Sequence, residues 1–148
     1  MPTERFKIVP AVYGIFLKDD QILLLRRYNT GYQDGNYSLP AGHLNGNETL
    51  KQALIREIME EIGIIVDKQD LELIHVINRN ANDAERIDFF FVIRNWQGEP
   101  QIMESNKCDE MKWVLKNDLP ENIAPEVKQA AYNIFNNKSI YSDMDFNE

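Results

Sequence analysis

The pattern of hydrophobic and polar positions along the chain predicts short strands interrupted by two helices. Residues 6–17 and 21–26 are mostly apolar and are expected to be strands, joined by a turn at Asp19 and Asp20. The next stretch is polar and aromatic, contains two glycines, and is expected to be a loop over residues 28–36. Further strands are expected at residues 37–42, 71–78, 87–95 and 111–115, with a polar turn at residues 80–85.

Two segments have the 3.6-residue period of an amphipathic helix. The first is expected to begin at about Glu48 or Thr49 and to end at Ile62, because Gly63 is a typical residue after a helix end. Its apolar stripe consists of Leu50, Leu54, Ile58 and Ile62. The second helix is expected at residues 125–136. Strands mixed with two helices predict an α/β (α+β) fold such as an α/β/α sandwich, without determining its topology.

The length and composition predict one soluble domain spanning residues 1–148, with a frayed tail from about residue 138. The N-terminus lacks the form of a signal peptide, and no apolar run reaches the roughly 20 residues of a membrane span. The lack of such a run favours a protein without membrane contact. Cys108 is the single cysteine and has no internal disulfide partner, which favours a reducing, cytoplasmic location. A net charge of −8 argues against nucleic-acid polymers as partners and favours a small-molecule substrate.

Three carboxylates lie close together on the first predicted helix. Glu57, Glu60 and Glu61 have the spacing i, i+3 and i+4, which places them within an arc of roughly 100°. Like charges at this spacing repel one another, and a divalent cation among them would offset the repulsion. Oxygen ligands favour magnesium, manganese or calcium over zinc. The alternative is a helix face that is simply solvated.

A longer pattern surrounds these carboxylates. Residues 42–64 read GHLNGNETLKQALIREIMEEIGI and match Gly-x5-Glu-x7-Arg-Glu-U-x-Glu-Glu-x-Gly-U, in which U is aliphatic. A chance match of the seven fixed positions in a chain of this length has a probability of about one in a million. The pattern is the Nudix box, so the chain resembles a Nudix hydrolase and, more loosely, the MutT-like branch that acts on nucleoside triphosphates.

This resemblance implies a Nudix fold, in which a mixed sheet lies between helices and the box forms a loop–helix–loop. It also implies a Mg²⁺-dependent pyrophosphohydrolase, with Mn²⁺ as an alternative metal, that cleaves a nucleoside diphosphate linked to a group X. A MutT-like member would convert a nucleoside triphosphate to the monophosphate and pyrophosphate. The expected metal ligands are the carbonyl group of Gly42 and the side chains of Glu57, Glu60 and Glu61.

The remaining catalytic roles follow from the same resemblance. Arg56 is expected to bridge to Glu48 and to orient the box glutamates, with direct contact to the substrate as the alternative. The group that deprotonates the attacking water is either a box glutamate such as Glu57 or a glutamate from a later loop. Glu104 and Glu110 are the later candidates, and Glu110 is preferred because it lies at the entrance to a predicted strand.

Substrate contacts are expected at three further positions. Arg26 and Arg27 end the second strand on opposite faces, so only one is expected to reach a phosphate group, and Arg26 is preferred. Tyr28 begins a loop with several tyrosines whose rings would stack on a nucleobase, although such rings also serve as loop anchors. Asn122 loosely matches the position of a base-reading asparagine in some MutT-like members.

Sequence marks of several other Nudix subfamilies are missing. Members specific for ADP-ribose usually have a proline about 15 residues after the box, but no proline occurs between Pro40 and Pro100. This absence favours a nucleoside triphosphate as the substrate. The alternatives are a hydrolase of a nucleotide sugar or another diphosphate ester, and a catalytically idle domain that senses nucleotides. The oligomeric state is left open, with a homodimer as one possibility.

Overall fold

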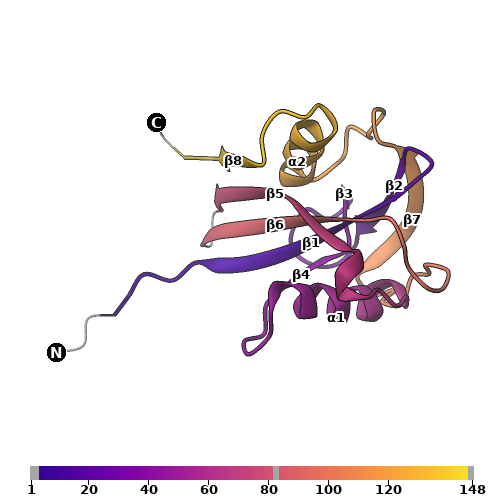
Figure 1. Ribbon diagram of the computed structural model, residues 1–148, viewed down its shortest axis with the longest axis horizontal. Coiled ribbons are helices and arrows are strands. Elements are labelled where there is room, and N and C mark those ends of the chain that lie inside the picture. Colours follow the sequence, from indigo (N-terminus) through magenta and orange to yellow (C-terminus); the bar gives the residue numbers. More distant parts are fainter. Residues whose placement is uncertain (1–3, 82–83, 147–148) are drawn as a thin grey trace.

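The computed structural model describes residues 4–81 and 84–146, and in these residues a mixed sheet has a helix on each face (Figure 1). The predicted α+β fold class is confirmed. No described helix is both long and apolar enough to cross a bilayer. In chain order the elements are β1 (Val9–Lys18), β2 (Gln21–Arg27), β3 (Tyr37–Ser38), β4 (Ala41–His43), α1 (Leu50–Ile62), a 3₁₀ turn (Lys68–Asp70), β5 (Leu71–Asn80), β6 (Glu85–Ile93), β7 (Cys108–Leu115), α2 (Pro125–Phe135) and β8 (Tyr141–Met144).

The sheet is divided at β1, which pairs with different strands along its length. The strand order is β3-β2-β1-β6-β5-β8, with β4 added to β1 and β7 added to β2. The end of β1 pairs with β2 at Leu17 and Lys18, whereas β1 runs parallel to β6 from Val9 to Phe16 and pairs with β4 from Ala11 to Tyr13. Strands β1 and β2 therefore diverge toward the start of β1, and the predicted strand at residues 37–42 becomes two strands with different partners.

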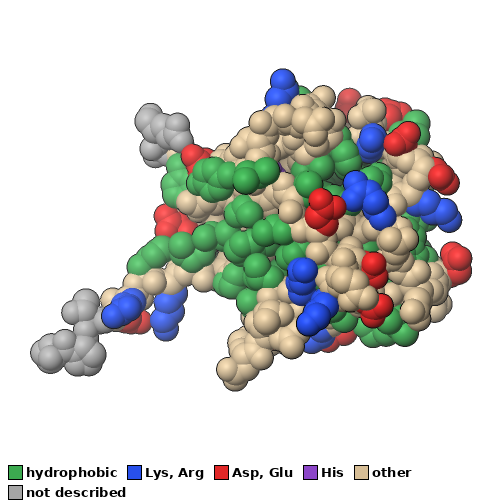
Figure 2. Space-filling model, in the orientation of Figure 1, with side chains coloured by type: hydrophobic (Ala, Val, Ile, Leu, Met, Phe, Trp, Pro, Cys, Tyr) green, Lys and Arg blue, Asp and Glu red, His purple; other side chains and the backbone are tan. Residues whose placement is uncertain are grey.

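Two cores lie on the opposite faces of the sheet, because side chains along β1 alternate in direction. Val12 and Phe16 pack toward α1, in a cluster that includes Leu54 and Ile58. Tyr13 and Ile15 pack toward α2, in a cluster that includes Phe90 and Val127. Figure 2 shows hydrophobic side chains gathered near the end of the sheet from which the termini leave, with acidic and basic side chains interspersed elsewhere on this face.

Helix α1 has a cap at each end that the local sequence supplies. The Thr49 side chain accepts a hydrogen bond from the backbone N–H of Gln52, and the Gln52 side chain accepts one from the N–H of Thr49. At the other end Gly63 has a φ of 69°, and its N–H donates to the carbonyl groups of Ile58 and Met59. The predicted helix bounds are therefore confirmed to within about a residue.

The prediction of a frayed tail is wrong for residues 141–144. They form β8, which runs parallel to β5, and Val76 lies opposite Tyr141 in the register. The tail sequence alone did not indicate a strand, because its partners are the free edge of β5 and the side chain of His75. Residues 1–3, 82–83 and 147–148, which belong to the predicted domain, turn and tail, lie outside the described residues.

Candidate active site

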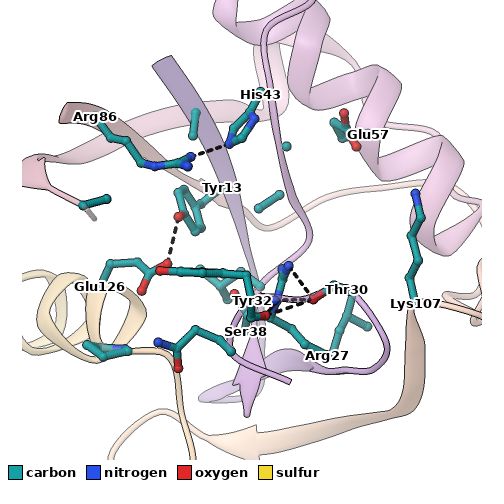
Figure 3. Close-up of a pocket in the computed structure, with 18 of the residues that line it drawn as sticks. Tyr13, Arg27, Thr30, Tyr32, Ser38, His43, Glu57, Arg86, Lys107 and Glu126 are labelled. Carbon is teal, nitrogen blue, oxygen red and sulfur yellow. Dashed lines mark hydrogen bonds between the residues drawn. The ribbon is translucent and has the colours of Figure 1, made fainter. Parts of the chain in front are cut away.

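A cavity of about 900 Å³ lies where the box, the loop at residues 28–36 and the start of α2 meet. Glu57 and Glu61 of α1 line it at one end, together with Gly42 of β4. Tyr13 of β1 and Glu126 of α2 line it at the other end. Figure 3 shows Glu57 and Glu126 on opposite sides of this space.

Arg56 holds the carboxylates at the first end. Its guanidinium group donates to Glu48 at 2.8 Å and to Glu57 at 2.7 Å, and it lies 3.6 Å from Glu60. The bridge from Arg56 to Glu48 that the sequence predicted is therefore present. Glu57 and Glu61 are four residues apart and face the cavity, whereas the Glu60 side chain is 51% exposed and does not line it.

The Glu57 carboxylate occupies the space that a side chain on residue 42 would need. A Cβ added to Gly42 would lie 2.1 Å from Cδ of Glu57 and 2.3 Å from its Oε1. Glycine therefore lets this carboxylate lie directly against the backbone of β4, close to peptide groups.

The electrostatics of this end fit a bound divalent cation. Burial raises the pKa of Glu61, and the negative charge of Glu57 raises it further. The backbone N–H of Ala41 donates to Glu61 at 3.3 Å, which only partly offsets the repulsion. Among the described residues, no three side chains of histidine, cysteine, aspartate or glutamate lie close enough together to hold a metal ion as they stand. The two crowded carboxylates and the adjoining Gly42 nevertheless form the hard oxygen donor set that Mg²⁺ or Mn²⁺ favours.

The opposite end of the cavity is built from a buried polar network. Arg79 of β5 donates to Asp88 of β6 at 2.8 Å and to the Tyr32 hydroxyl at 2.9 Å, and its guanidinium group lies 3.8 Å from Glu126. The Tyr13 hydroxyl donates to Glu126 at 3.0 Å (Figure 3). Burial and the neighbouring carboxylates raise the pKa of Tyr13, so its hydroxyl stays protonated and keeps donating.

Sequence reasoning missed this network, although one signal pointed to it. Asp88 lies two residues before the core residue Phe90 on β6, so both side chains point to the same face of the sheet, and Asp88 is fully buried. A carboxylate at an inward position of an apolar strand needs a partner, and burial raises its pKa, while Arg79 lowers it in part. Its partner Arg79 lies in β5 and Glu126 lies in α2, so the sequence of β6 alone does not identify them.

Both arginines at the end of β2, Arg26 and Arg27, line the cavity. Arg26 lines the cavity and forms ion pairs with Asp109 at 2.8 Å and with Glu110 at 3.2 Å. Arg27 also lines it, and donates to the carbonyl group of Tyr32 at 2.6 Å. The register of β2 and β7 shifts between these two residues: Arg26 lies opposite Glu110 and Arg27 opposite Cys108, so the extra residue of the bulge, Asp109, belongs to β7.

Three other predicted residues do not line the cavity. Tyr28 is 50% exposed, and Tyr32 takes its place on the cavity wall. The Asn122 side chain donates to the carbonyl group of Gly35 at 3.0 Å and is thereby used as a loop contact. Glu110 lies opposite Arg26 in the β2–β7 register and is bound to it.

Glu104, the less favoured of the two later-loop candidates, lines the cavity. The loop before β7 folds back onto the box, and the N–H of Met103 donates to the carbonyl group of Glu61 at 3.0 Å. The negative charge of Glu104 is one of the causes that raise the pKa of Glu61. This contact joins segments about 40 residues apart in the chain, so local sequence patterns did not reveal it.

Comparison with known proteins identifies the family. The NUDIX domain family model matches residues 7–135. The chain belongs to the Nudix family. This membership places it among hydrolases that act on phosphorus anhydrides, and its relatives include MutT-like proteins.

An ADP-ribose pyrophosphatase from Methanocaldococcus jannaschii is 46% identical over 111 residues, which are 75% of this chain and 64% of that protein. The 8-oxo-dGTP diphosphatase of Escherichia coli K12 is 28% identical over 123 residues, covering 82% of this chain and 94% of the relative. Among solved structures, a MutT NUDIX hydrolase from Burkholderia pseudomallei has a TM-score of 0.80 at 24% identity, covering 86% and 98% of the two chains. This last likeness confirms the Nudix fold.

Proposed function

We propose that this Nudix chain is a Mg²⁺-dependent pyrophosphohydrolase that cleaves a nucleoside triphosphate to the monophosphate and pyrophosphate. The observation that carries the proposal is the position of Glu57 and Glu61 against Gly42, at one end of a cavity long enough to continue to Tyr13 and Glu126. A substrate with a phosphate chain at one end and a nucleobase at the other matches this arrangement.

Glu57, Glu61 and the Gly42 carbonyl group would hold the metal, with Glu60 completing the set from the outer flank of α1. The bound metal would supply charge neutralisation for the phosphate oxygens and a more acidic water. Arg56 keeps the Glu57 carboxylate in one orientation through its 2.7 Å hydrogen bond. This contact supports a positioning role for Arg56 and a metal-binding role for Glu57, and the same guanidinium group lies 3.6 Å from Glu60.

The cavity also contains groups suited to the proton and to the phosphate charge. Glu104 replaces Glu110 as the proposed later-loop base, because Glu104 lines the cavity and Glu110 is bound to Arg26. A general base must lie within hydrogen-bond reach of the water that it deprotonates. Arg26 and Arg27 provide guanidinium groups on the cavity wall that would bind phosphate oxygens of the substrate.

A second candidate is hydrolysis of ADP-ribose or another diphosphate ester. The observation in its favour is the 46% identity to the archaeal protein named as an ADP-ribose pyrophosphatase. The chain has no proline between Pro40 and Pro100, and so lacks the proline after the box that is typical of members specific for ADP-ribose. This absence still favours a nucleoside triphosphate as the substrate. A panel that includes nucleoside triphosphates, ADP-ribose and nucleotide sugars separates the two candidates.

The experiment measures Mg²⁺-dependent release of phosphate or pyrophosphate from this panel by the wild type and by Glu57→Gln and Glu60→Gln. We expect each box variant to lower turnover by at least about a hundredfold with the fold intact. Glu72→Gln is the matched control, because the Glu72 side chain is 61% exposed on β5 and does not line the cavity. Equal rates in the wild type and the box variants would overturn the assignment, and nucleotide binding without any hydrolysis would indicate a sensor.

A further inference from the structure

The C-terminal segment contributes to the cavity although it lies beyond the part of the chain that the family model matches. That match ends at residue 135, whereas Met144 of β8 and the following Asp145 line the cavity. One wall of the cavity is therefore built by a segment outside the matched domain.

This segment is anchored from two sides. On the sheet side, the N–H of Val76 donates to the carbonyl group of Ile140 at 2.9 Å, and β8 continues parallel to β5. The two ring nitrogens of His75 bond the carbonyl group of Ser139 and the hydroxyl group of Ser142, each at 2.9 Å. Because a carbonyl oxygen only accepts, Nδ1 of His75 carries the proton in this arrangement.

Helix α2 provides the second anchor. The amide group of Gln129 donates to the Ser142 hydroxyl at 2.8 Å and to the carbonyl group of Asp143 at 2.9 Å. Alternation along β8 then directs Tyr141 and Asp143 outward and leaves Met144 facing the protein. The strand therefore holds Met144 in a defined position.

Met144 lies beside the buried polar network. It is opposite Arg79 in the β5–β8 register, and it packs against the core cluster that contains Tyr13. Arg79, Tyr13 and Glu126 line the same cavity. The thioether supplies an apolar surface next to polar groups, and ligand sites that bind a flat ring with a hydrogen-bonding edge have this composition.

We propose that β8, through Met144, is a specificity-determining wall for the nucleobase, at the substrate end remote from the cleaved linkage. This inference rests on the proposed function and extends it to a segment that the matched domain does not contain. Met144 would affect which nucleobase binds. It takes no part in hydrolysis of the phosphate linkage, which would occur at the end of the cavity formed by Glu57 and Glu61.

The test compares Met144→Trp and Met144→Ala with Tyr141→Ala, which alters the outward face of the same strand and does not line the cavity. KM and kcat are measured with ATP, GTP, CTP and UTP. We expect Met144→Trp to raise KM by about tenfold or more for the preferred base, and Met144→Ala to reduce the discrimination between bases by a factor of about three to ten. We expect kcat to stay within about threefold of the wild type and Tyr141→Ala to change neither constant by more than about twofold.

Thermal unfolding of each variant shows whether β8 and the rest of the fold are retained. Unchanged KM values and unchanged base ranking in both Met144 variants would overturn the proposal. If the wild type hydrolyses none of these nucleotides, the proposed function fails, but calorimetric binding of the same nucleotides still decides the present inference. In that case equal affinities in the wild type and in Met144→Trp would overturn it, and a loss of about tenfold would support it.

Discussion

Replacing Gly42 with alanine is expected to lower turnover by about a hundredfold while leaving the fold nearly unchanged. Gly42 is not among the residues with positive φ, so alanine is compatible with its backbone. The added Cβ would lie 2.1 Å from Cδ of Glu57, where ordinary contacts begin at 3.4 Å. The carboxylate must therefore move by more than about 1 Å.

A displacement of this size in a positioned catalytic group lowers turnover by about a hundredfold. The cost in stability is smaller. The hydrogen bond from Arg56 to Glu57 would be weakened, but alanine also restricts the unfolded chain, so the free energy of unfolding should change by about 1 kcal/mol or less. The assay is steady-state hydrolysis of the preferred nucleotide with Mg²⁺, combined with urea unfolding.

Gly46→Ala is the matched control and should show the reverse behaviour. Gly46 has a φ of 91° and no atom within 4 Å of an added Cβ. Alanine there is strained, which should cost about 1–2 kcal/mol of stability, without moving Glu57. Turnover of Gly42→Ala within about threefold of the wild type would refute the reasoning that Glu57 needs this contact with β4.

Two further predictions concern groups outside the box. Burial lowers the pKa of His75 in the folded protein, so the unfolded chain binds the proton more readily and the stability falls as the pH drops through and below about 6.5. The variant His75→Gln should therefore show a flatter dependence of Tm on pH between about 7 and 5.5. An unchanged slope would contradict this prediction. Arg79→Met leaves the buried Asp88 carboxylate without its cation and should lower the free energy of unfolding by about 3–5 kcal/mol in urea titrations. Adding Asp88→Asn should recover part of that loss, whereas strictly additive effects would show that the two residues do not interact.

The fold class and the box helix were predictable because their signals are local. The 3.6-residue hydrophobic period, the N-cap residue Thr49 and the C-cap residue Gly63 specify α1, and all of them lie within or next to the helix in the sequence. The divided sheet was not predictable in the same way. The separation of residues 37–42 into β3 and β4 depends on which strands lie beside them.

The candidate site was predicted in part. The bridge from Arg56 to Glu48 was expected and is present in the structure. Arg26, the arginine preferred for phosphate contact, lines the cavity, as does Arg27. Glu110 was preferred over Glu104 because of its strand position, but folding of the preceding loop onto the box brings Glu104 to the cavity instead. Of the loop tyrosines, Tyr32 lines the cavity and Tyr28 does not, and the hydroxyl group of Tyr32 is held there by Arg79 of β5.

By itself, the sequence determined the carboxylate face of α1, its caps and the box that identifies the family, because residues a few positions apart on a helix are necessarily close in space. The tertiary structure alone decided the opposite end of the cavity. The hydrogen bond from Tyr13 to Glu126 joins residues 113 positions apart, and β8 lies beside β5 only because that edge and His75 are available to it. Contacts of this kind depend on how the whole chain packs, and the hydrophobic periodicity of a local segment does not predict them.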